Sequence, residues 1–506
     1  MWRYPSGVVL GICCSTVSVA AHADTNAQAT EILNSVQRTV GAYEQAMWQH
    51  RFGDALKYAE KLPVPTDSKQ GKALVDAMRA SALLGLRREA EARALIKDSY
   101  ELAPEIPDPS STILYGALTA GRYDVAADAI DRMIALFPDT VRYVDPDVML
   151  DFIRNAPSAQ ERRNDDRKVA LGRLRFGGDT AWGYFFSENA VEILVNRGDF
   201  KSASELLPQV KDPVALQGML IQKRYSPLWQ QIGQLAGPQF RTVNASAVLS
   251  LERAYTDAPD DGQALASYVD ALRHAGRTDD AIALRSKLPS TRSGIVSANE
   301  KTGWALNSVA YALHDAGRKD EADKLFAFLN DAPMAVGNWR ISTMINRVEL
   351  LLADGQEYKA LPLITSTLRV PGSNYAEQLL RGLRYCALSR LGRGGDAQRY
   401  KPDFLAHASD APIDTIDGLL CGGDLEGAEK LALSELSNPD LDKRADFEKD
   451  FVRRLQSRPL IGDDPPVWQS RWTEFRQRPA IASAFSRLGR DMPAEFVSSA
   501  AASVPR

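Results

Sequence analysis

The stretch Trp304–Leu329, WALNSVAYALHDAGRKDEADKLFAFL, holds two apolar runs on either side of a glycine. Within each run the apolar residues recur at helical spacing. The first run comprises Leu306, Val309, Ala310 and Leu313, and the second Ala322, Leu325, Phe326 and Leu329. This spacing predicts two amphipathic helices. Gly317 suits the left-handed residue just past a helix end, where a Cβ is disfavoured. Ala322 is small where paired helices approach to about 8–10 Å. The stretch therefore predicts one helical hairpin.

The same step of five residues from a glycine to an alanine occurs nine times along the chain. The pairs are Gly85/Ala90, Gly121/Ala126, Gly198/Ala203, Gly276/Ala281, Gly317/Ala322, Gly355/Ala360, Gly392/Ala397, Gly423/Ala428 and Gly489/Ala494. An upstream copy has His50 at the turn and Ala55 five residues later. Histidine can take the turn position because it is one of the few non-glycine residues that tolerate the left-handed backbone region. Neighbouring turn glycines lie 31 to 78 positions apart, and the longest gaps equal two periods. Repetition of this length predicts a helical solenoid.

The unit resembles the tetratricopeptide repeat (TPR) family. Aligned on Ala322, the small, apolar, turn, aromatic and proline positions of that family fall on Ala310, Leu313, Gly317, Phe326 and Pro333. The resemblance covers residues 40–135 and 190–440 and extends to the looser helical-hairpin repeats of bacterial envelope proteins. It implies an all-α fold, a right-handed α-solenoid of antiparallel helix pairs without significant β-sheet.

The repeats divide the chain into blocks. Residues 24–140 are predicted to form N-terminal hairpins, and 246–440 the regular repeats. Between them, in 141–245, the period blurs, and an irregular hairpin is expected to turn near Lys223. Residues 441–506 are predicted to form an arginine-rich helical cap.

The N-terminus, residues 1–23, has the pattern of a secretory signal. Arg3 precedes an apolar run from residue 8 to residue 20, and Ala21-His22-Ala23 provides a small-x-small cleavage site. The alternatives are an uncleaved anchor and, on Cys13 and Cys14, a lipid-anchored variant. No other stretch is apolar over the roughly 20 residues that a bilayer span needs. We therefore expect an exported, periplasmic protein, or one peripheral to a membrane, with no transmembrane span after cleavage.

Two cysteines, Cys386 and Cys421, remain after such cleavage and lie in neighbouring repeats. Export would permit a disulfide between them. Buried free thiols on first helices are the expected state, because unpaired cysteine is among the most buried residue types.

Catalytic and metal-binding patterns are not found in the sequence. It has no HExxH, paired CxxC, GxSxG or phosphate-binding glycine loop. His274 and His314 fall in the last turns of predicted helices, where a cation complements the helix dipole. We expect a protein without enzymatic activity, cofactor or metal. A net charge of −4 gives no overall footprint for nucleic acid.

The TPR resemblance implies that the first helix of each antiparallel pair lines a concave groove. Eight residues of this sequence align with the groove positions of the family: Trp304, Asn307, Tyr311, His314, Asp270, Arg273, Glu349 and Arg390. Aromatic side chains there would supply contact area, and polar ones would fix hydrogen bonds. The alternative is that Trp304 and Tyr311 only fill space against the previous repeat.

The C-terminal block is locally basic. Between residues 453 and 490 there are eight arginines against three carboxylates. A solenoid needs a capping end with a polar outer face, so a solvated cap is one interpretation. The other is a contact surface for an anionic partner, with Arg471, Arg476 and Arg478 as candidates. Trp468, Trp472 and Phe475 lie at i, i+4 and i+7 and are expected to pack the cap rather than stack on a sugar.

These patterns favour a non-enzymatic scaffold or adaptor of the cell envelope. Its groove would bind a peptide or a protein partner in envelope biogenesis, secretion or exopolysaccharide export. The alternative is a glycan-binding or peptidoglycan-processing accessory protein whose basic cap contacts an anionic glycan.

Overall fold

A computed structural model of the chain describes residues 26–63, 68–156, 161–331, 339–457, 460 and 469–497. Within these ranges there is no β-strand, and the one isolated β-bridge joins Gln222 to Gly489. No helix in the described ranges combines the length and apolarity that crossing a membrane requires. The all-α class is confirmed. The predicted signal, residues 1–23, lies outside the described residues.

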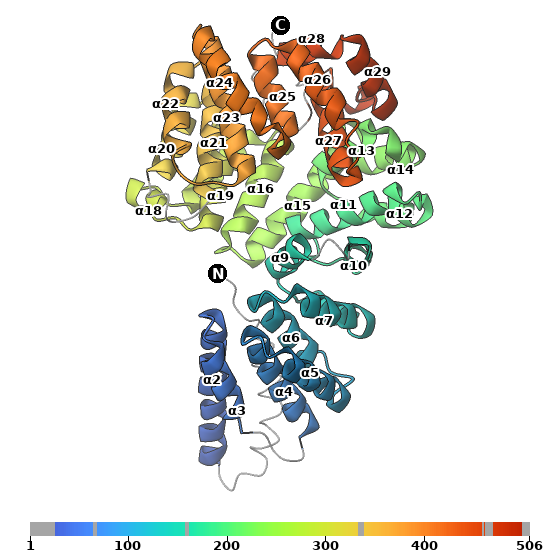
Figure 1. Cartoon of the computed structure of the whole chain (residues 1–506), viewed down its shortest axis with the longest axis vertical. Coiled ribbons are helices and arrows are strands. Elements are labelled where there is room, and N and C mark those ends of the chain that lie inside the picture. The colour runs from blue at the N-terminus through green and yellow to red at the C-terminus, as the bar shows by residue number, and fades with distance from the viewer. Residues whose placement is uncertain are drawn as a thin grey trace. The chain divides into compact units, whose positions relative to one another are not determined.

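The chain divides into two compact units, and the division falls at residues 178–198. Unit 1 comprises α2 (Asn26–Trp48), α3 (Phe52–Glu60), α4 (Lys69–Gly85), α5 (Glu89–Leu102), α6 (Asp108–Thr119), α7 (Tyr123–Leu136), α8 (Pro138–Val141), α9 (Pro146–Asn155), α10 (Glu161–Arg173) and α11 (Ala181–Asn196) (Figure 1). In its N-terminal part, successive helices pack in antiparallel pairs, α2 with α3, α4 with α5, and α6 with α7.

Unit 2 begins with short helices: α12 (Phe200–Leu206), η2 (Leu207–Gln209), α13 (Pro213–Ile221), η3 (Lys223–Leu228), α14 (Trp229–Ala236), η4 (Pro238–Phe240) and α15 (Arg241–Asp257). Repeats follow in α16 (Gly262–His274), α17 (Thr278–Ala283), η5 (Leu284–Lys287), α18 (Arg292–Val296), α19 (Glu300–Asp315), α20 (Lys319–Asn330), α21 (Trp339–Ala353), α22 (Glu357–Thr367), α23 (Asn374–Arg390), α24 (Gly394–Ala406), η7 (Ala408–Asp410), α25 (Pro412–Cys421) and α26 (Leu425–Glu435). The unit ends in α27 (Leu441–Arg454), α28 (Gln469–Arg476), α29 (Pro479–Leu488) and η8 (Ala494–Phe496).

The turn between α19 and α20 shows why the sequence makes hairpins. Gly317 has φ +76°, and its amide donates to the carbonyl oxygen of His314 at 2.8 Å. The next amide, of Arg318, donates to the carbonyl oxygen of Leu313 at 2.8 Å. These two bonds satisfy carbonyls that the end of α19 would leave unpaired. Ala322 is then 1% exposed, packed where the two helices meet.

The same turn recurs through both units. Left-handed residues occupy the predicted positions His50, Gly121, Gly198, Gly276, Gly355, Gly392 and Gly423. The alanines five residues later are all buried: Ala55, Ala126, Ala203, Ala281, Ala360, Ala397 and Ala428. The TPR-like helical-hairpin architecture is thereby confirmed from the chain's own geometry.

Two of the nine predicted pairs are wrong. Gly85 lies inside the last turn of α4, and the left-handed residue is Arg87, with φ +58°. The buried alanine of that repeat is Ala92, five residues after Arg87. Gly85 has a packing role instead, because a Cβ there would lie 2.3 Å from the ring of Phe52.

The second error is Gly489, whose φ of −143° is that of extended backbone rather than a turn. The irregular hairpin expected near Lys223 is present, since α13 ends at Ile221, η3 begins at Lys223 and α14 packs against α13; its connection is a stretch of 3₁₀-helix rather than a left-handed turn at Lys223. In this region the left-handed residues are Gly237, Gln239 and Phe240.

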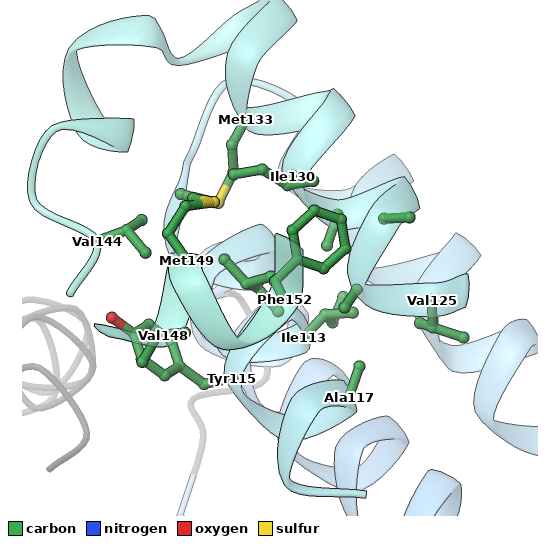
Figure 2. Packing of buried hydrophobic residues seen from close by; sticks show 14 of the residues in the cluster. Ile113, Tyr115, Ala117, Val125, Ile130, Met133, Val144, Val148, Met149 and Phe152 are labelled. Carbon is green, nitrogen blue, oxygen red and sulfur yellow. The ribbon is translucent and has the colours of Figure 1, made fainter. Parts of the chain in front are cut away.

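The core of unit 1 is built where consecutive hairpins stack. Figure 2 shows Ile113 of α6, Ile130 and Met133 of α7, and Phe152 of α9 in one cluster. Each of these four side chains is at most 1% exposed. Burying a side chain of this size contributes roughly 1.5–3 kcal/mol, so each hairpin is stabilised mainly by its neighbours.

The expectation of free thiols is wrong. Cys386 of α23 and Cys421 of α25 form a disulfide, with a Cα–Cα distance of 5.2 Å. The two first helices α23 and α25 pack directly against each other, which brings equivalent positions of adjacent repeats within bonding distance. A sequence without coordinates cannot supply that distance.

Candidate functional site

The candidate groove residues lie on the first helices of the regular repeats in unit 2. These first helices are α16, α19, α21, α23 and α25, and each packs against its second helix, α17, α20, α22, α24 and α26 respectively. α19 and α21 are strongly enclosed, with ten buried residues each. Polar side chains on such helices face either a neighbouring repeat or the unit's own surface.

Arg273 ties α16 to α19. Its guanidinium lies 3.2 Å from Asp270 Oδ1 and 2.9 Å from Asp315 Oδ2, and 4.9 Å from the centre of the Tyr311 ring. Ser308 Oγ donates to the other oxygen of Asp270 at 3.0 Å. Three predicted residues, Asp270, Arg273 and Tyr311, are thus brought together in one charged contact between adjacent repeats.

The next contact joins α19 to α21. Asn346 Nδ2 donates to Asn307 Oδ1 at 2.9 Å, and Asn307 is 7% exposed. His314 Nε2 lies 3.3 Å from both carboxylate oxygens of Asp354, which also pairs with Lys319 at 2.5 Å. His314 therefore bridges to the following repeat, in addition to its place in the last turn of α19.

The series continues at Arg390 of α23. Its guanidinium lies 2.7 Å from Glu357 Oε1 and donates to the carbonyl oxygen of Leu352 at 3.0 Å. Trp304 is partly buried, and Tyr311 is buried edge-on against Phe326 at 5.9 Å. Most of the predicted groove residues thus have contacts within or between repeats, and their contact with a partner stays a prediction.

A feature that the sequence did not reveal is an acidic cluster around Tyr375, made of Glu349, Asp414 and Asp450. These residues and Tyr375 come from four alternate helices, α21, α23, α25 and α27, and Arg454 of α27 adds a positive charge that opposes the carboxylates. Tyr375 exposes 54% of its surface. Partial burial, then the charges of Asp414, Glu349 and Asp450, raise the pKa of its phenol. Because these residues are spread over about a hundred positions of the sequence, no local sequence pattern indicates that they lie close together.

Asp414 is the most perturbed carboxyl of this cluster. Burial, followed by the negative charge of Asp417, raises its pKa to about 7, and Arg454 opposes the shift. Asp417 itself accepts a hydrogen bond from Trp472 Nε1 at 2.5 Å and pairs with Arg454 at 3.2 Å. Arg454 already supplies a positive charge near Tyr375 and Asp414, and the three carboxylates outnumber it in this cluster.

The basic side chains predicted for an anionic partner are paired within the chain. Arg471 lies 2.9 Å from Glu474, and Arg476 makes two bonds of 2.7 Å to Asp491. Arg478 donates to Glu429 at 2.5 Å. Trp472 and Phe475 are 2% and 0% exposed, so they pack the cap as predicted, whereas Trp468 lies outside the described residues.

No group of three His, Cys, Asp or Glu side chains in the described ranges is arranged to hold a metal ion. Burial lowers the pKa of His274. The carboxylate of Asp270 opposes this shift, and the positive charges of Arg273 and Arg453 add to it.

A hollow of about 500 Å³ lies in unit 1 between α5 and α7. Arg132 crosses it, 4.4 Å from the ring of Tyr100, and donates to the carbonyl oxygen of Pro104 at 3.0 Å. None of the predicted site residues lines this hollow.

Comparisons with known proteins add little. No protein-family model matches the chain, and no curated protein matches it. Among solved structures it is similar to the crystal structure of the P58(IPK) TPR domain, with 14% identity over 80% of this chain and 100% of that chain and a TM-score of 0.20. The fold is established by the turns and helix pairs of the chain itself.

Proposed function

We propose that this protein is a scaffold without catalytic activity, which binds an extended segment of a protein partner across the first helices of unit 2. Stacked helical hairpins present long surfaces that proteins of this architecture use for binding. A segment running across the repeats could contact one or two side chains from each first helix. Specific binding then needs no single pocket.

The observation that carries this proposal is the exposed ring of Tyr375 on the first helix α23, which packs against the first helices α21 and α25 on either side. An aromatic ring that is 54% exposed among carboxylates from neighbouring helices offers both contact area and charge. A basic side chain of the partner fits this arrangement, because a cation is attracted by the ring face and by the carboxylates.

We further propose that the protein works in the cell envelope. The signal-like N-terminus motivates this location, and the Cys386–Cys421 disulfide supports it, since disulfides persist mainly in oxidising compartments. Cell fractionation tests the location directly. Recovery of the chain in the cytoplasm with both thiols reduced would contradict it.

The alternative partner, an anionic glycan on the C-terminal arginines, has weaker support. Arg476 and Arg478 would have to leave Asp491 and Glu429 to meet it. Replacing Arg471, a more exposed residue, should therefore leave partner binding unchanged.

Site-specific photo-crosslinking tests the binding surface. A photoreactive phenylalanine analogue replaces Tyr375 on a first helix or Tyr358 on the second helix α22, and both tyrosines are well exposed, at 54% and 65%. We expect a protein adduct from position 375 that position 358 does not give. The adduct should weaken when Trp304→Ala and Asn307→Ala are added. Equal adducts from both positions would refute the first-helix surface.

A further inference from the structure

The last described segment of unit 2, Gly489–Val497, is here called the C-terminal strap. It follows α29 and lies against the start of the same unit. Its one bridge is antiparallel, between Gly489 and Gln222, and the amide of Arg490 donates to the carbonyl oxygen of Ile221 at 2.9 Å. Gly489 is required by this close approach, because a Cβ would lie 2.5 Å from Val452 and 3.1 Å from the Ile221 oxygen.

The first side-chain anchor of the strap is Arg490. Its guanidinium carbon lies 3.4 Å from the centre of the Trp229 ring, and its Nε donates to the carbonyl oxygen of Leu220 at 2.8 Å. Trp229 is held in place by its own bond to the carbonyl oxygen of Met219, at 3.1 Å. A cation stacked on an indole is the strongest contact of this type, more so when partly desolvated.

The second anchor is Phe496. Its ring centre lies 5.7 Å from that of Phe240 in η4. It also covers Gly233 of α14, where a Cβ would come within 2.9 Å of the Phe496 ring. Gly233 therefore leaves the space that this ring occupies.

The end of α27 holds the other side of the strap. The amide side chain of Gln456 donates to the carbonyl oxygen of Arg490 at 3.1 Å and accepts from the amide of Met492 at 2.9 Å. Asp491 is fixed by Arg476. The strap thus joins α13, α14 and η4, at the start of unit 2, to the helices at its end. α13 also packs against α27 (Figure 1).

A main-chain bridge combined with separate side-chain anchors is how folded domains recognise extended peptides. We propose that the surface formed by α13, α14 and η4 is a peptide-recognition site that the chain fills with its own C-terminal strap as a releasable clasp. The site fits a segment in which an arginine is followed six residues later by a phenylalanine that ends a short 3₁₀-helix, η8. Of the strap residues only Gly489 is buried; Met492 packs against the core cluster of α25, α27, α28 and α29, and the other strap residues are partly or fully exposed. This inference does not rest on the proposed scaffold function.

Binding of the strap sequence in trans tests the proposal. The probe is a fluorescent peptide with the sequence of residues 486–497, SRLGRDMPAEFV, and the protein is the full chain carrying Arg490→Ala and Phe496→Ala. We expect saturable binding to this variant, measured by fluorescence anisotropy. The unaltered chain should bind at least about tenfold more weakly, because its own strap competes at an effective concentration in the millimolar range.

Matched variants identify the anchors. Adding Trp229→Ala to the strap variant should weaken peptide binding by roughly tenfold or more. The control is Arg487→Ala, which removes an arginine of α29 that lies just before the strap and donates to Ser483 Oγ. It should leave binding as in the unaltered chain. A folded strap variant that binds no peptide, or binds it equally with and without Trp229, overturns the proposal.

Hydrogen exchange of the unaltered chain gives a second readout if the strap variant does not fold. A releasable strap opens locally, so the amides of Arg490 and Met492 should exchange faster than the core amides of α25. Excess peptide should slow exchange of the α14 amides in a Phe496→Ala chain. Strap amides that exchange only as slowly as the α25 core would show that the clasp does not open, and the proposal would fail.

Discussion

Opening the Cys386–Cys421 disulfide should destabilise unit 2 by an amount that the structure allows us to estimate. The bond closes a loop with a sequence separation of 35. In the chain-entropy model, a loop of this length restricts the unfolded chain by about 4 kcal/mol at 25 °C. Because unfolded chains retain some structure, we expect Cys386→Ala with Cys421→Ala to lower the free energy of unfolding by about 2–4 kcal/mol.

The assay is urea unfolding of a chain that starts at Asp24, followed by circular dichroism with and without a reductant. The reductant should lower the unfolding midpoint of the unaltered chain and leave that of the double-alanine variant unchanged. Mass spectrometry of a non-reduced digest should contain one peptide pair linked through Cys386 and Cys421. An unaltered chain that is insensitive to reductant, or two free thiols in the digest, would refute the reasoning.

Two further predictions concern buried charges of unit 2. Arg340 is 0% exposed and donates to the carbonyl oxygens of Leu329, Val296 and Ala298, so Arg340→Lys should cost about 2–4 kcal/mol in urea unfolding. The exposed Arg399→Lys is its control, and an equal effect of both would contradict the prediction. The folded-state pKa of Asp414 is raised from 3.8 to about 7, so its contribution to stability is greatest below pH 4 and is lost as the pH rises through 7. Asp414→Asn should therefore stabilise unit 2 at pH 8 by on the order of 1–2 kcal/mol and change little at pH 4; stability equal to the unaltered chain at pH 8 would count against it.

Much of the fold could be predicted from the sequence because the hairpin turn is a local device. Gly317 and Ala322 report, within one stretch, both the end of a helix and the close packing of the next. Arg87 shows the limit of that pattern. Its repeat keeps the turn and the buried Ala92, but a non-glycine residue takes the left-handed position, so the nearby Gly85 was mistaken for it.

Contacts between distant segments could not be predicted. The strap lies more than 260 positions from the α13 residues that it meets, and neither apolar spacing nor composition encodes that pairing. For the same reason, the acidic residues around Tyr375 appeared as unrelated charges on separate helices. The candidate groove residues, taken from the TPR resemblance, lie on the first helices of the repeats, but their partners in adjacent repeats, such as Asp354 for His314, depend on how the repeats stack.

The central claim is that each hairpin closes at one left-handed residue, and a pair of opposite substitutions tests it most directly. The left-handed strain at Arg87 is released by Arg87→Gly, which should raise the free energy of unfolding by about 0.5–1 kcal/mol. Gly317 has φ +76°, and a Cβ at this position would meet no other atom. Gly317→Ala therefore adds only backbone strain and should lower the free energy of unfolding by about 1 kcal/mol. Urea unfolding of the two variants should therefore give shifts of opposite sign. Shifts of the same sign, or none at either position, would contradict the account.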